Sequence, residues 1–211
     1  MKKLFGILAA SALAVSAFAQ GTVVFNNSGS SLVKQWTSAS DSALMSVPKA
    51  GGSVQLIYAA PGTAYHSLLG PVGTTGAPLN YTTLGDYLAA NTGWTAGPIA
   101  SILPIAAGQF AGGTVTLTGI AAGGNASYAI LGWNGASANL NAAITAKAFI
   151  GEVTPLTTAT GGAGSPPSTA IALTATFQGM TLVPTGVIPE PSTFALAGLG
   201  AAAMLILRRR K

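Results

Sequence analysis

The chain has 211 residues, which is enough for one domain with a sizeable core. Only 6% of them are charged, against about 25% in an ordinary soluble domain, and 49% are hydrophobic, which argues against a disordered chain. Cysteine is absent, so disulfides, thiolate metal sites and a cysteine nucleophile are excluded.

The positive charge lies at the two ends of the chain. The net charge is +5, yet residues 20–188 contain three basic and three acidic side chains. A nucleic-acid surface needs clustered Lys and Arg, so we expect no nucleic acid among the partners. The other basic residues flank the body: Lys2, Lys3, Arg208, Arg209, Arg210 and Lys211.

Residues 1–19 have the pattern of a secretory signal peptide. Lys2 and Lys3 form a basic start, residues 4–18 an apolar stretch, and Ala17-Phe18-Ala19 a small-x-small cleavage site for signal peptidase. The alternative is a short N-terminal membrane anchor. We expect export, with a mature chain that begins at residue 20 or 21.

Several runs in the body alternate like half-buried strands. Residues 22–29 place Val23 and Phe25 on one face, and residues 53–62 alternate similarly before a Pro-Gly stop. Residues 113–119 place Val115 and Leu117 inward, with threonines outward. Residues 125–135 are apolar on both faces, which predicts a central strand that ends in an Asn-Gly turn.

The run at residues 171–183 changes phase in its middle. Every second residue up to Phe177 is apolar and would lie on one face. The alternation then shifts by one residue and continues with Met180 and Leu182. A bulge at Gln178-Gly179 would keep one strand with one apolar face. The alternative is two unrelated short strands joined by a turn; we favour the bulge.

Helix is scarce in this sequence. Only residues 82–91 and 136–149 are candidates, with Asp86 as a cap of the first, and residues 61–80 and 160–169 have the composition of loops. We therefore predict an all-β fold: a single antiparallel β-sandwich, jelly-roll or Ig-like, over residues 20–188.

Catalytic chemistry has few candidate groups in the body. These are one histidine and three carboxylates, and no G-x-S-x-G motif accompanies them. His66 is expected to be a solvated loop residue, and Glu152 to lie near a turn. We expect a noncatalytic protein without a metal or another cofactor.

A carbohydrate-binding module is the alternative function. Three tryptophans and five tyrosines could provide stacking faces for sugar rings. Trp133 shares a face with Leu131 and Ala129 and is expected in the core. Trp94 is in an expected loop, so it is the candidate glycan contact.

The C-terminal segment combines three features. Residues 193–207 carry no charge, and as a helix they would span about 22 Å, less than the ~30 Å hydrocarbon core. The basic residues Arg208, Arg209, Arg210 and Lys211 would hold this end on the cytoplasmic side. Before the apolar stretch, Pro189-Glu190-Pro191 predicts a stiff, extended and exposed backbone. The alternative is a linker before a permanent anchor.

These three features in this order resemble the PEP-CTERM sorting signal of Gram-negative bacteria. The resemblance implies recognition of Pro189, Glu190 and Pro191 by exosortase, a membrane-embedded cysteine enzyme that acts like a sortase. It also implies a precursor anchored in the inner membrane by a transmembrane helix, and delivery to the cell surface or an exopolysaccharide matrix. Residues 189–211 would form this signal. The body resembles, more weakly, secreted proteins with the same signal from the Verrucomicrobia.

Overall fold

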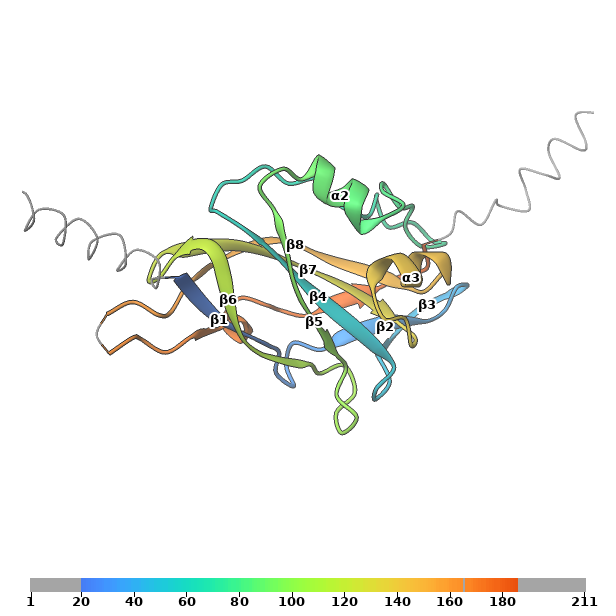
Figure 1. Ribbon diagram of the computed structural model, residues 1–211. Coiled ribbons are helices and arrows are strands. Elements are labelled where there is room, and N and C mark those ends of the chain that lie inside the picture. The colour runs from blue at the N-terminus through green and yellow to red at the C-terminus, as the bar shows by residue number, and fades with distance from the viewer. Residues whose placement is uncertain (1–19, 165, 186–211) are drawn as a thin grey trace, which may run out of the picture.

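The computed structural model describes residues 20–164 and 166–185, which form three β-sheets and two short α-helices (Figure 1). The strand orders in the sheets are β6-β1-β9, β10-β2-β3 and β5-β4-β7-β8. The strands are β1 (Gln20–Asn26), β2 (Val33–Ser38), β3 (Asp41–Ser46), β4 (Gly52–Ala59), β5 (Thr95–Ser101), β6 (Ala111–Ala121), β7 (Asn125–Asn134), β8 (Ile150–Ala159), β9 (Ile171–Ala172) and β10 (Met180–Leu182).

One hydrophobic cluster joins the three sheets. Its members come from β1 and β6, from β2 and β10, and from one face of β4 and β7. Val23 and Phe25 are buried on β1, and Val115 and Leu117 on β6, while the threonines beside them on β6 face solvent. The period-2 expectation for these two strands is confirmed, and the fold is mostly β as predicted.

The four-stranded sheet is buried on both of its faces. β7 lies inside this sheet, and all its residues from 126 to 133 are buried, which confirms the expectation of a central strand. Ala129, Leu131 and Trp133 share its second face, and Trp133 is fully buried as expected. The helices α2 (Leu84–Ala90) and α3 (Leu140–Thr145) pack on this second face.

Both helices fall inside the predicted ranges, and each begins at a side-chain cap. The Thr83 hydroxyl accepts a hydrogen bond from the Asp86 backbone N–H (3.0 Å) and donates one to the Asp86 carboxylate (2.8 Å). Asp86 therefore lies in the first turn of α2, and the expectation that it caps the helix is wrong. Asn139 caps α3 by accepting from the N–H of Ala142.

The prediction of one bulged strand over residues 171–183 is wrong. The segment forms β9, a 3₁₀ turn at Leu173–Ala175 and β10, and the two strands belong to different sheets. Leu173 and Phe177 are buried because the turn brings residues four positions apart onto one side, whereas Ile171 is exposed. The alternative of two short strands joined by a turn is the correct one.

The expectation of a purely antiparallel sheet arrangement also needs correction. β9 pairs with β1 in parallel, and β10 pairs with β2 in parallel, while the remaining strand pairs are antiparallel. Both parallel strands come from the segment that crosses from one three-stranded sheet to the other. Its 3₁₀ turn separates two pairings that one continuous strand could not make.

Candidate functional site

The last described residues are fastened to the body. Val183 and Ile150 exchange two backbone hydrogen bonds of 2.9 Å each, and the Pro184 carbonyl accepts from the N–H of Ala77 at 3.0 Å. The Thr185 hydroxyl donates to the carbonyl oxygen of Ala148. The chain is therefore hydrogen-bonded to the body as far as Thr185.

Glu152 is a partly buried carboxylate near the start of β8, so it belongs to a strand that follows a turn. Its oxygens accept hydrogen bonds from the Tyr65 hydroxyl and from the backbone N–H groups of Leu68 (2.9 Å) and Leu69 (3.3 Å). Burial raises the pKa of Glu152, and these hydrogen bonds oppose the rise. The carboxylate thus fastens the 65–69 loop to the four-stranded sheet.

Two more side chains hold the same loop and the residue just before it, Ala64. Asn91, at the C-terminal end of α2, accepts from the N–H of His66 (2.6 Å) and donates to its carbonyl oxygen (3.0 Å). The indole N–H of Trp94 donates to the carbonyl oxygen of Ala64 at 2.7 Å. Glu152, Asn91 and Trp94 therefore act together as supports of one loop, a role that local sequence patterns do not reveal.

The expectation that Trp94 is exposed is wrong. Its side chain is only 6% exposed, and its ring packs on that of Tyr65 with centroids 4.9 Å apart. Trp36 and Trp133 are buried too, and no aromatic side chain in residues 20–164 and 166–185 is exposed. Sugar stacking needs an open ring face, so the carbohydrate-binding alternative loses the residue on which it rested.

The titratable residues are dispersed over the body. His66 is exposed, as expected, and its backbone rather than its ring makes the contacts with Asn91. Asp41 lies on β3, where the N–H of Ala43 and the hydroxyl of Thr37 lower its pKa. Within the described part of the chain, no three His, Asp or Glu side chains gather in a way that could hold a metal ion.

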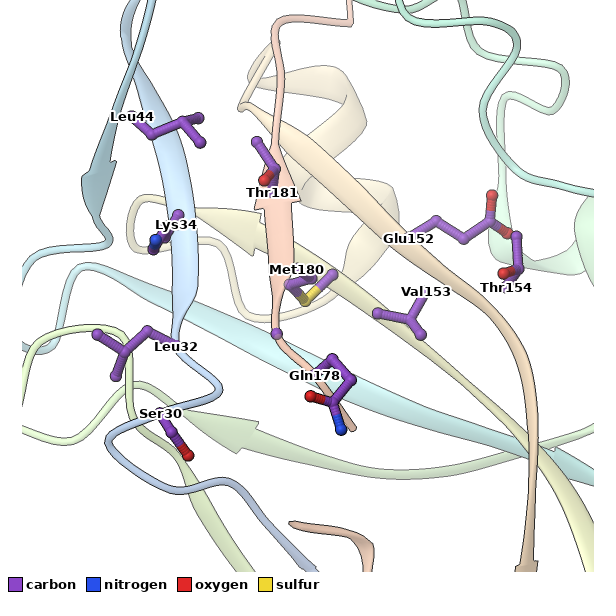
Figure 2. A pocket seen from close by; sticks show the side chains of 11 residues that line it. Ser30, Leu32, Lys34, Leu44, Glu152, Val153, Thr154, Gln178, Met180 and Thr181 are labelled. Carbon is purple, nitrogen blue, oxygen red and sulfur yellow. The ribbon is translucent and has the colours of Figure 1, made fainter. Parts of the chain in front are cut away.

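A groove of about 490 Å³ opens between β2, β10 and β8 (Figure 2). Figure 2 shows Lys34 and Leu44 on one side, Val153 and Thr154 on the other, and Thr181 between them. Its polar groups are one ammonium, several hydroxyls and an amide, together with the Glu152 carboxylate, which already accepts hydrogen bonds. Among the described residues that line it there is neither a nucleophile–base pair nor an aromatic face.

The sorting residues predicted from the sequence lie outside the described residues. These are Pro189, Glu190 and Pro191, together with the basic tail Arg208, Arg209, Arg210 and Lys211. The signal peptide expected at residues 1–19 lies outside them as well. In the part of the chain that the structure covers, no helix is long and apolar enough to cross a membrane.

Comparison with known proteins identifies one part of the chain. Residues 187–211 match the model of the PEP-CTERM protein-sorting motif, and this match begins two residues after Thr185. No curated protein and no solved structure matches the chain. The chain therefore carries a PEP-CTERM sorting motif, which implies export, a membrane-anchored precursor and exosortase as the processing enzyme.

Proposed function

We propose that this chain is a noncatalytic structural protein of the cell surface or extracellular matrix of a Gram-negative, Verrucomicrobia-like bacterium. A sandwich-like body, residues 20–188, is exported by a signal peptide and released from its anchor at the PEP-CTERM signal. The observation that carries the proposal is the position of the motif at residues 187–211, directly behind a body that is fastened up to Thr185.

The position of the motif limits where processing takes place. Four residue steps separate Thr185 from Pro189, and a fully extended chain covers at most about 14 Å over that length. Exosortase would therefore work close to the body surface around Ala77, Ala148 and Thr185. For this, the end of the body must be held in place where the signal begins, and the backbone hydrogen bonds of Val183 and Pro184 hold it there.

The chemistry of the body supports a structural role in a polysaccharide layer. Its few charges balance, and hydroxyl and backbone groups rather than ionised groups dominate the surface strands, as on β6 with its outward threonines. Such a surface can hydrogen-bond to exopolysaccharide whether or not the sugars carry charge. The partly buried carboxylate of Glu152 is occupied in holding a loop.

The test is the intact mass of the protein isolated from its native host, with and without the exosortase gene. We expect the mature protein to lack residues 192–211 in the first strain and to retain them in the second. Glu190→Gln should retain the tail, whereas Pro166→Ala, in an exposed loop, should be processed normally. Retention of the tail by the unaltered protein in the unaltered host would instead establish a permanent anchor.

A further inference from the structure

β3 is an open edge of a sheet. Among residues 20–164 and 166–185, the order β10-β2-β3 gives it a neighbour on one side only, and its residues from Asp41 to Met45 are all exposed. Leu44 is 54% exposed and Met45 39%. An exposed edge with apolar side chains is a template on which another strand can pair.

The other long edge strands of the described body carry protective features, which β3 lacks. Pro98 interrupts β5, and Pro155 lies in β8 beside an irregularity in its pairing with β7. β6 contains Gly113 and Gly119, which have positive φ angles of 74° and 82°. Prolines and bulges of this kind prevent strand addition. β3 has neither proline nor lysine, and a single charged residue, Asp41.

The hydrogen-bond pattern of the β2–β3 pair shows which groups of β3 are free. The N–H of Val47 donates to the carbonyl oxygen of Val33 in β2 at 3.0 Å, so the backbone polar groups of Val47 point toward β2. Bonding alternates along an antiparallel pair, so Met45, opposite Gln35, also faces β2. The N–H and C=O groups of Leu44 and Ser46 therefore point to the open edge.

We propose that β3 pairs with β3 of a second copy of this chain, in an antiparallel register centred on Leu44. This inference goes beyond the proposed function and rests on the body alone. A two-fold axis normal to the sheet places Leu44 opposite the same residue of the second copy, and Ser42 opposite Ser46. Ala43 then lies opposite Met45 on the other face.

A second copy fits this edge because the pairing is self-complementary. The outward N–H and C=O groups of Leu44 meet the matching groups of its symmetry mate, which gives two mutual hydrogen bonds. The exposed Leu44 and Met45 side chains gain apolar cross-strand neighbours. The charged residue, Asp41, lies opposite Val47, so that no like charges meet.

The pairing is expected to be weak between free molecules. Six residues a side bury less than the ~1,000 Å² that a stable interface usually needs. Molecules concentrated at a surface would pair much more readily. A covalent trap is therefore the suitable readout, and the absence of cysteine makes one available.

The experiment uses full-length chains with single cysteines, purified in detergent and oxidised mildly. Leu44→Cys places two thiols in directly paired positions with Cα atoms about 5.5 Å apart, within disulfide reach. Ser42→Cys is the matched control, because its two copies would lie about 13 Å apart along the strands. We expect several-fold more covalent dimer from Leu44→Cys than from Ser42→Cys.

A mixture tests the register itself. Ser42→Cys and Ser46→Cys chains together should form a mixed dimer, and adding Leu44→Lys to both should abolish it by opposing two ammonium groups. Thermal melting of each variant checks that the body stays folded. Equal cross-linking of Leu44→Cys and Ser42→Cys, or no dimer from either, would overturn the proposal. If the edge of β3 instead pairs with polysaccharide or with another protein, neither cysteine variant would form a dimer.

Discussion

Gly151 of β8 lies directly against the carbonyl oxygen of Thr181 in β10, so closely that a Cβ atom at position 151 would collide with that oxygen. Its cross-strand neighbour Gly132 lies under Met180, where a Cβ would come within 2.9 Å of the sulfur and the terminal methyl group. The paired glycines let β10 lie directly on the four-stranded sheet. Two sheets therefore approach each other more closely than side chains would permit.

This contact predicts different effects for two alanine substitutions. Gly151→Ala should lower the free energy of unfolding by about 3 kcal/mol, because a backbone carbonyl must move. Gly132→Ala should lower it by only about 1 kcal/mol, because the flexible Met180 side chain can turn aside. Chemical denaturation of both variants measures the difference. Equal losses would show that β10 is free to shift as a whole.

A second prediction concerns Asn27, a buried amide. Its nitrogen donates to the carbonyl oxygens of Ser31 (2.7 Å) and Gly108 (2.9 Å), and its oxygen accepts from the N–H of Phe110 (2.7 Å). Asn27→Ala leaves three buried groups without this partner and should cost about 3 kcal/mol. Asn27→Asp should cost more near neutral pH, because a carboxylate would face two carbonyl oxygens.

The Asn27→Asp variant should also depend on pH. Its surroundings would raise the pKa of the new carboxyl above the ordinary value of about 3.9. A raised native pKa means that the lost stability returns as the pH falls toward that value. Melting temperatures of Asn27→Asp and Asn27→Ala should therefore converge in acid. Parallel curves for the two variants would contradict the hydrogen-bond assignment.

A third prediction concerns Glu152. Because burial raises its pKa above 4.5, the folded state binds this proton more tightly than the unfolded state. Its contribution to stability is fully present below pH 4.5 and is lost as the pH rises through the native pKa. Glu152→Gln cannot titrate. The free energy of unfolding of wild type, measured relative to that of Glu152→Gln, should therefore fall from acid to neutral pH, and a rise would reverse the sign of the shift.

A fourth prediction separates support from glycan contact at Trp94. Trp94→Ala should destabilise the body by about 4 kcal/mol, because it removes a buried indole and the support of the 65–69 loop. Trp94→Phe keeps most of the packing and loses the hydrogen bond to Ala64, so it should lower the free energy of unfolding by only about 1 kcal/mol. Polysaccharide binding by the folded Trp94→Phe protein should match wild type. Selective loss of binding would restore the carbohydrate-binding alternative.

The sequence predicted those parts of the fold in which local periodicity determines burial. Val115 and Leu117 alternate with threonines, and β7 is apolar on both faces, so each pattern has one structural solution. The run at residues 171–183 has two solutions. A slip in phase can be a bulge within one strand or a break between two, and the choice depends on which sheets lie nearby.

The supports of the 65–69 loop depend on contacts between distant parts of the sequence. Glu152 holds Leu68 and Leu69 across 84 and 83 positions, and Trp94 holds Ala64 across 30. A tryptophan between glycine and threonine therefore looks like an exposed loop residue, although its burial is supplied by a segment far upstream. The sorting signal is the opposite case, because its three features are contiguous in the sequence.

The fastening of Thr185 has a mechanical consequence. The start of β1 and the red end of the described chain lie at opposite ends of the body, so tension between these two ends runs along the whole molecule (Figure 1). At the C-terminal end it first loads the Ala148 and Ala77 contacts and the paired bonds at Ile150, and then the parallel β10–β2 ladder. Pulling on the C-terminal end of the body would thus detach β10 first, with the four-stranded sheet still intact.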